Sequence, residues 1–155
     1  MLWLKILVIK IYYQKNLELN TNLDISVAMK VYIIWLIGVV YYANYLKYLE
    51  RARTEALVKI GLSNQKIKDD FGALIIVKSC NVDYKKSAYL EDILNIKSNI
   101  TSITKTSFIM KQIIIKNKTI IVDAKVHLVF VNEKVKPVKI PQLIIDKFEP
   151  FNSKN

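Results

Sequence analysis

Apolar residues recur at three- and four-residue intervals between Ala43 and Ile60, which predicts an amphipathic helix. The stripe that should face the core consists of Leu46, Leu49, Ala52, Ala56 and Ile60. The two alanines keep this stripe slim, so a sheet could approach the helix axis closely. Gly61 follows as a left-handed C-terminal cap. Ser63 is placed to cap a short second helix that runs to about Lys68.

Beyond Gly72 the pattern changes to an alternation of apolar and polar residues, which predicts a succession of strands. The four predicted strands run from Ala73 to Tyr84, Ile93 to Ile100, Thr104 to Lys116 and Thr119 to Val131. Asn117 suits a tight turn between the last two strands, because asparagine tolerates positive φ. The segment QLIIDKF, which starts at Gln142, predicts a last helical turn.

The last predicted strand has the clearest two-faced pattern. Its core face should consist of Val122, Ala124, Val126, Leu128 and Phe130, and its other face of Asp123, Lys125, His127 and Val129. One long helix followed by consecutive antiparallel strands is an α+β arrangement, in which the sheet must wrap around the helix to bury its stripe. The 155 residues, of which 52% are hydrophobic, suffice for one such domain.

The net charge of +11 raises the possibility of a nucleic-acid partner. Among the 24 basic residues, however, arginine occurs only at Arg51 and Arg53, and the lysines are scattered along the chain. A solvated, lysine-rich surface is therefore the better interpretation, and we expect no nucleic-acid partner. Such a surface would still attract an anionic ligand, and coenzyme A carries phosphates.

Cys80 is the sole cysteine, which excludes an intrachain disulfide and a cysteine-based metal cluster. It lies in the apolar run LIIVKSCNV, where we expect a buried structural thiol. The first ten residues lack the cleavage site of a signal peptide, so cytoplasmic residence is favoured. Residues from Val31 to Leu46 form a competing membrane candidate of 16 uncharged residues, slightly short of the ~20 that span a bilayer.

The run GVVYYANYLKYLERARTEALVKIGLS, which starts at Gly38, resembles the helix-start motif of the hotdog-fold acyl-CoA thioesterases. These are the 4-hydroxybenzoyl-CoA thioesterase-like proteins, and the resemblance is to their Tol-Pal-associated branch. It continues through DYKKSAYLEDIL, AKVHLVFVN and KPVKIP, in the family's order. The resemblance implies an antiparallel sheet wrapped around one long central helix, and no metal or redox cofactor. It also implies homodimers or homotetramers with active sites at the dimer interface.

In the family that the chain resembles, the thioester carbonyl is held at the N-terminus of the central helix. There, unpaired backbone N–H groups and the helix dipole favour a developing oxyanion. The resemblance assigns these amides to Val40, Tyr41 and Tyr42, with Asn44 in support. It places Gly38, Tyr42 and Asn44 in the substrate-binding site. An alternative role for Tyr42 and Asn44 is to anchor the start of the helix at a subunit contact.

Other residues that match the family have simpler interpretations. Glu50, Arg51, Arg53 and Glu55 are packed closely enough on one helix to form a local ion network. His127 is the sole histidine and alternates onto the outer face of the last strand, where we expect a surface or interface residue.

The family's pattern is interrupted just before Gly38. Relatives carry Asp-Thr-Asp a few residues upstream, and the second aspartate acts as nucleophile or general base. Residues 33–37 of this chain are IIWLI, which cannot attack a carbonyl or accept a proton from water. Glu18 and Asp24 are the upstream acids, and neither matches the motif. We interpret the region as an insertion or a frame-disrupted stretch.

Two segments compete for the first strand, Ile9 to Gln14 and Lys30 to Ile33, and the former is closer to the family. We therefore divide the chain into an irregular N-terminal extension (1–28), a hotdog thioesterase domain (29–149) and a tail (150–155). The predicted function is hydrolysis of an acyl-CoA to a free acid and coenzyme A. The alternatives are an inactive hotdog oligomer that binds acyl thioesters or partner proteins, and a small membrane-anchored protein.

Overall fold

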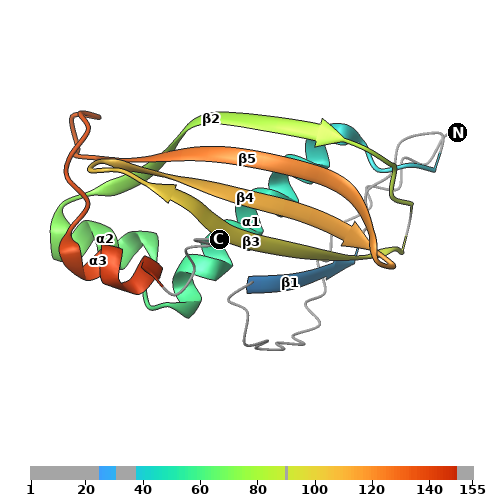
Figure 1. Cartoon of the computed structure of the whole chain (residues 1–155), viewed down its shortest axis with the longest axis horizontal. Helices are drawn as coiled ribbons and strands as arrows, with labels where there is room; N and C mark the ends of the chain where they lie inside the picture. The colour runs from blue at the N-terminus through green and yellow to red at the C-terminus, as the bar shows by residue number, and fades with distance from the viewer. Residues whose placement is uncertain (1–24, 31–37, 90, 150–155) are drawn as a thin grey trace, which may run out of the picture.

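The computed structural model describes residues 25–30, 38–89 and 91–149. Its elements are β1 (Ile25–Lys30), α1 (Tyr42–Lys59), α2 (Asn64–Phe71), β2 (Leu74–Tyr84), β3 (Ile93–Ile103), β4 (Ser107–Lys116), β5 (Thr119–Val131) and α3 (Gln142–Phe148). The strands form one antiparallel sheet in the order β1-β3-β4-β5-β2. Helix α1 runs along one face of this sheet, and α2 and α3 lie together at one end (Figure 1). The predicted α+β class is confirmed.

Helix α1 matches the predicted helix to within one residue at each end. Gly61 ends it with φ +74°, and the Leu62 N–H bonds to the Leu57 carbonyl, as a left-handed cap requires. The core stripe is confirmed at its centre, where the buried residues are Leu49, Ala52 and Ala56. It is wrong at Leu46, which is 41% exposed, because Tyr45 occupies the sheet-facing position in that turn.

Local side-chain chemistry sets the boundaries of two other elements. The Ser63 hydroxyl accepts a bond from the Lys66 N–H at 3.1 Å and caps α2, as predicted. Strand β4 begins at Ser107, later than predicted, because Thr104 bonds both the N–H and the carbonyl of Ser107 and holds a turn there. Asn117 has φ +47° in the hairpin turn between β4 and β5, which confirms its predicted role.

The first described strand differs from both predicted candidates. Strand β1 pairs with β3, with Ile25 opposite Ser98 and Lys30 opposite Ile93. The candidate from Lys30 to Ile33 overlaps β1 at one residue, and the candidate from Ile9 to Gln14 lies outside the described residues. The expected boundary between residues 28 and 29 falls inside β1.

The core consists of two clusters along α1. One surrounds the first half of the helix, and the other joins its second half to α2 and α3. The five residues predicted for the core face of β5 are all buried. Cys80, in contrast, is exposed, so the prediction of a buried thiol is wrong. Cys80 pairs with the buried Val126 of β5. Strand β2 is the last strand in the order, however, so the face of β2 that carries Cys80 is only partly covered.

The predicted membrane segment does not form one helix in the part that the structure describes. Val39 makes a β-bridge with Tyr89, and the residues from Tyr42 onward belong to α1. Residues 31–37 lie outside the described residues. No helix in the described ranges is long and apolar enough to cross a bilayer.

Candidate active site

The chain reaches α1 through a short extended segment. Gly38 has φ +78°, a left-handed conformation that glycine adopts without strain. Val39 then bridges to Tyr89, and the Val40 N–H donates to the Ala88 carbonyl at 2.9 Å. Tyr41 is the N-cap residue with φ −63° and ψ 132°, and its side chain makes no capping hydrogen bond. The segment before α1 is thus fixed by the loop that follows β2.

Two backbone N–H groups are presented at the start of α1. Those of Tyr42 and Ala43 have no acceptor within a helix, because they belong to its first turn. Neither donates to another acceptor in the described ranges, whereas the Asn44 N–H bonds to the Tyr41 carbonyl at 2.9 Å. The first turn contains no acidic residue to neutralise the positive end of the helix dipole. This helix end can therefore hold a developing oxyanion.

The arrangement corrects the predicted set of carbonyl-polarising amides. Val40 lies before the helix and its N–H is used by the Ala88 carbonyl, so it cannot serve a ligand at the same time. Tyr41 is the cap, and Tyr42 is the first helical residue, as the predicted role of its amide requires. The sequence interpretation missed Ala43, whose amide is also presented, because it started the polarising turn two residues too early.

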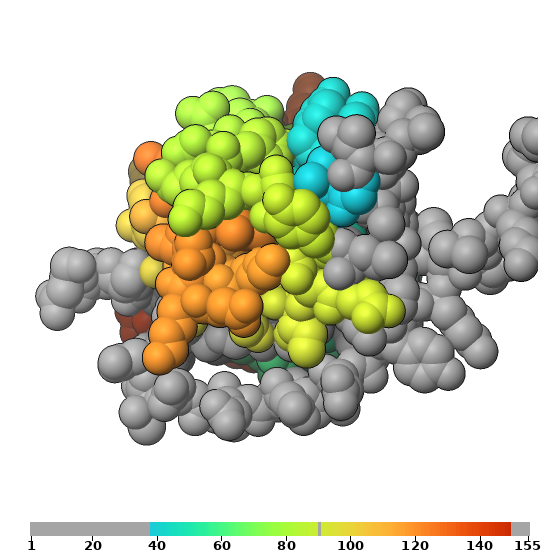
Figure 2. Space-filling view, turned by 90° about the vertical axis from the view of Figure 1, so that its right-hand side faces the viewer, coloured from blue at the N-terminus to red at the C-terminus, as the bar shows by residue number. Residues whose placement is uncertain are grey.

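Tyrosine rings surround this helix end. The Tyr42 ring lies 4.5 Å from that of Tyr41 and 6.1 Å from that of Tyr84, measured between centroids. The centroid of the Tyr45 ring lies 5.9 Å from that of Tyr84 and 6.2 Å from that of Tyr48. Tyr42 is 58% exposed. Figure 2 shows this end of the molecule, where the start of α1 lies beside the end of β2 and the loop that follows it.

The three residues predicted to bind substrate gather at this end but differ in exposure. Gly38 leads into the helix, and the Tyr42 side chain projects into solvent. Asn44 is buried, with 4% of its surface exposed. Tyr42 is therefore the one of the three whose side chain is best placed to meet a ligand, and Asn44 is better placed to stabilise the turn.

A carboxylate lies in the same loop as Ala88. Asp92 accepts a bond from the Tyr89 N–H at 2.7 Å and pairs with the Lys116 ammonium at 2.6 Å. Burial raises the pKa of Asp92, but the bonds from Lys116 and Tyr89 outweigh it, so that the pKa lies below its ordinary value of 3.8. A carboxylate bound in this way stabilises the loop and is a poor proton acceptor.

The Asp92 contacts predict a loss of stability in acid. Because the folded-state pKa is depressed, the stabilisation is present above the ordinary pKa and is lost as pH falls through the folded value. The difference in unfolding free energy between the wild type and Asp92→Asn should therefore shrink below about pH 4. Urea denaturation from pH 3 to pH 7 would measure it, and a constant difference across this range would contradict the assignment.

A buried polar network joins α1 to the sheet. The Arg53 guanidinium donates to the Gln112 amide oxygen at 3.0 Å, and the Gln112 nitrogen donates to Ser98 Oγ at 2.8 Å and to the Leu49 carbonyl at 3.0 Å. Burial lowers the pKa of Arg53, and the nearby Glu50 acts to raise it. The predicted ion network on the helix is thus incomplete, because the hydrogen bond of Arg53 crosses to β4.

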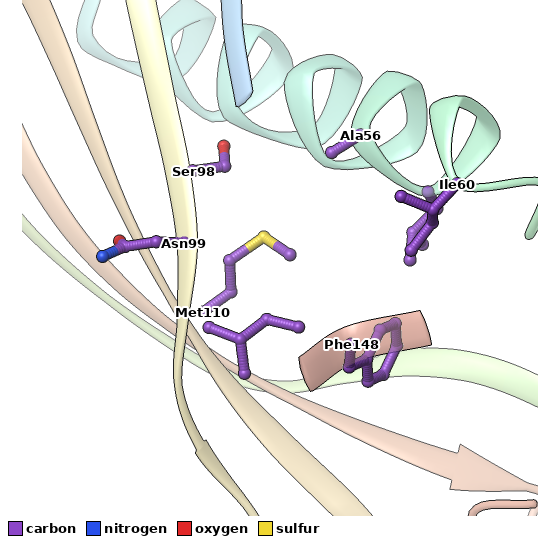
Figure 3. A pocket seen from close by; sticks show the side chains of 8 residues that line it. Ala56, Ile60, Ser98, Asn99, Met110 and Phe148 are labelled. Carbon is purple, nitrogen blue, oxygen red and sulfur yellow. The ribbon is translucent and has the colours of Figure 1, made fainter. Parts of the chain in front are cut away.

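The second half of α1 borders a separate cleft. It is small and partly open to solvent, and it is lined by Ala56, Leu57, Ile60, Ser98, Asn99, Ile100, Met110 and Phe148 (Figure 3). At 1.5 Å per residue, Ala56 is about 21 Å along the helix from Tyr42. The cleft is therefore remote from the presented amides, and it is mainly apolar.

His127 lies neither at the start of α1 nor in the cleft. Its Nε2 is 2.9 Å from Ser107 Oγ, and the ring is half-buried on the sheet face opposite α1. The described residues contain no group of three or more potential metal-ligating side chains that could hold an ion.

Comparisons with known proteins agree with the fold. The family model of the Thioesterase-like superfamily matches residues 23–148. The acyl-CoA thioester hydrolase YbgC of Escherichia coli is 37% identical over 114 residues, covering 72% of this chain and 84% of that protein. The acyl-CoA thioesterase YbgC of Haemophilus influenzae is 31% identical over 106 residues, covering 68% and 78%.

Solved structures show the same architecture. The 4-hydroxybenzoyl CoA thioesterase from Pseudomonas has a TM-score of 0.75 at 20% identity, covering 80% of this chain and 98% of that one. A probable thioesterase from Bartonella henselae has a TM-score of 0.72 at 28% identity, covering 76% and 99%. The fold is therefore the predicted hotdog fold, with an antiparallel sheet around one long helix. The chain belongs to the thioesterase-like superfamily.

Proposed function

We propose that this protein is an acyl-CoA thioester hydrolase, which uses water to cleave an acyl-CoA into a free acid and coenzyme A. The observation that carries the proposal is the start of α1, where the Tyr42 and Ala43 N–H groups face no acceptor in the described ranges. It occurs in a chain whose relatives are named acyl-CoA thioester hydrolases. Cytoplasmic residence stays a prediction.

The proposed chemistry takes place at the thioester carbonyl. Attack by water converts the carbonyl oxygen into an oxyanion, which the two N–H groups and the helix dipole stabilise. The attacking water gives up one proton to solvent; collapse of the tetrahedral intermediate then breaks the C–S bond, expels the coenzyme A thiolate, which takes up a proton from solvent, and leaves the free acid. Tyr42 and Tyr84 supply exposed aromatic surface beside the reacting carbon.

The sequence before Gly38 favours one alternative function. Residues 33–37 contain no carboxylate, and Asp92 is occupied by Lys116. A protein with the oxyanion-binding helix end but without a general base would bind acyl thioesters and turn them over slowly or not at all. This function is the inactive hotdog oligomer, the alternative that the sequence left open.

One assay separates the two functions. Purified protein is mixed with short, long and aromatic acyl-CoAs, and a thiol reagent detects the coenzyme A that is released. Turnover that depends on protein concentration is the expected result. Acyl-CoA binding in a calorimetric titration, without release of thiol above the buffer rate, would replace the hydrolase by the binding protein.

We also propose that the protein is a homodimer that associates through β2. Among the described strands this 11-residue strand ends the sheet, so its outer edge can accept an antiparallel partner strand. Its exposed apolar side chains Val77 and Tyr84 lie on the face that carries α1, where Leu46 is also exposed. Light scattering after size exclusion should give twice the chain mass of 18.0 kDa.

A further inference from the structure

The start of α1 is enclosed by a ring of hydrogen bonds that passes through Ala88. The Val40 N–H donates to the Ala88 carbonyl at 2.9 Å, and the Ala88 N–H donates to the Tyr45 hydroxyl at 2.8 Å. The chain from Val40 to Tyr45 is continuous, so these two bonds close a ring that includes the first turn of the helix. The N–H groups of Tyr42 and Ala43 are part of that enclosed turn.

The bond made by Tyr45 is protected from solvent. Tyr45 is 3% exposed and Ala88 is completely buried. Burial is also the main cause that raises the pKa of Tyr45, so its hydroxyl is a neutral phenol near pH 7. A buried N–H without an acceptor is costly, which keeps this bond formed in the folded protein.

The position of Ala88 is fixed, because hydrogen bonds attach its loop to the sheet. The Lys85 and Lys86 N–H groups donate to the Ile121 carbonyl of β5 at 2.9 and 3.2 Å. On the other side, the Tyr89 N–H donates to Asp92, which is paired with Lys116 at the end of β4. The loop from β2 to β3 is therefore attached to two strands. The hydrogen bond between Ala88 and Tyr45 then fixes the position of the helix relative to this loop.

We infer that Tyr45 is a positioning residue for thioester hydrolysis: through the Ala88 N–H it fixes the direction in which the first turn of α1 presents its amides. The inference rests on the proposed function. A developing oxyanion is stabilised only by donors that are already in place, and small displacements of such groups are costly for the reaction rate. The hydroxyl acts through Ala88 and needs no contact with the substrate.

Tyr45→Phe tests the role, with Tyr48→Phe as the matched control. Both variants remove one phenol hydroxyl from neighbouring rings of α1, but of these two hydroxyls only that of Tyr45 bonds Ala88 in the part of the chain that the structure describes. We expect kcat of Tyr45→Phe to fall about tenfold with KM changed less than twofold, and Tyr48→Phe to match the wild type. This split identifies positioning, because a substrate-binding role would raise KM. Assays are run well below the melting temperature of both variants.

Amide hydrogen exchange followed by NMR gives a second readout that needs no turnover. In Tyr45→Phe the Val40 and Ala88 N–H groups should exchange at least about tenfold faster. The Ile140 N–H, which bonds the Lys105 carbonyl in another part of the fold, should be unaffected. Unchanged exchange at Val40 and Ala88, or equal losses of kcat in the two variants, would overturn the inference. Absence of turnover by the wild type would instead refute the proposed function, while the exchange rates still report whether Tyr45 holds the turn.

Discussion

Replacement of Tyr42 by proline should lower kcat about 10²- to 10³-fold relative to Tyr42→Ala, because proline removes one of the two proposed oxyanion donors. Tyr42 is the first residue of α1, a position where proline is tolerated in helices. Tyr41 already has φ −63° and ψ 132°, the extended conformation that a following proline requires. The substitution thus removes an N–H group with little change to the backbone. Steady-state hydrolysis of the best acyl-CoA substrate measures the effect.

Tyr42→Ala is the essential control, since it loses the same exposed side chain and keeps the N–H group. Any contribution of the phenol ring to binding is common to both variants and cancels in their ratio. Circular dichroism and thermal melting should show that both remain folded. If Tyr42→Pro and Tyr42→Ala hydrolyse the substrate at the same rate, the Tyr42 amide is not an oxyanion donor.

The long helix and the last four strands, β2 to β5, could be predicted because their information is local. The stripe from Leu49 to Ala56 has a clear helical period, and Ser63 and Asn117 adopt conformations that their own side chains favour. Strand β1 could not be predicted in this way. Its sequence ISVAMK is only weakly alternating, and its place is set by pairing with β3 far along the chain.

The predicted site stays a prediction, but the amides presented at the start of α1 are those of Tyr42 and Ala43 and not those of Val40 and Tyr41. The resemblance located the turn, yet the loss of Val40 as a donor depends on its bond to Ala88, 48 residues away in the sequence. The residue at which α1 starts is set by tertiary contacts, because the N-cap residue Tyr41 makes no side-chain capping bond. The exposure of Cys80 likewise follows from strand order, which an apolar run does not specify.

The sequence contains one sign of the polar network between α1 and the sheet. Gln112 interrupts the buried positions of β4 between Met110 and Ile114, where an apolar residue would be expected. A glutamine at such a position needs a polar partner. Arg53 fulfils this need from α1, 59 residues away, so the pair could be recognised only after helix and strand were placed together.

Gln112→Leu should lower the free energy of unfolding by about 3 kcal/mol, because it leaves the buried Arg53 guanidinium without its amide acceptor. The loss includes the bonds to Ser98 and to the Leu49 carbonyl, while leucine roughly conserves the side-chain volume. Urea denaturation at pH 7 measures the change. Gln65→Leu is the matched control, since Gln65 bonds Asp69 on the exposed surface of α2 and should change stability by less than about 0.5 kcal/mol.

A double variant shows whether the loss comes from the unpaired charge or from the missing bonds of glutamine. Arg53→Met combined with Gln112→Leu replaces both partners by apolar groups of similar shape, which is often nearly neutral in a buried site. The double variant should therefore be more stable than Gln112→Leu alone, although it carries one more substitution. The stability of Arg53→Met alone is measured as well. If the double variant loses as much stability as the two single variants together, Arg53 and Gln112 stabilise the protein independently, and the hydrogen bond between them contributes little.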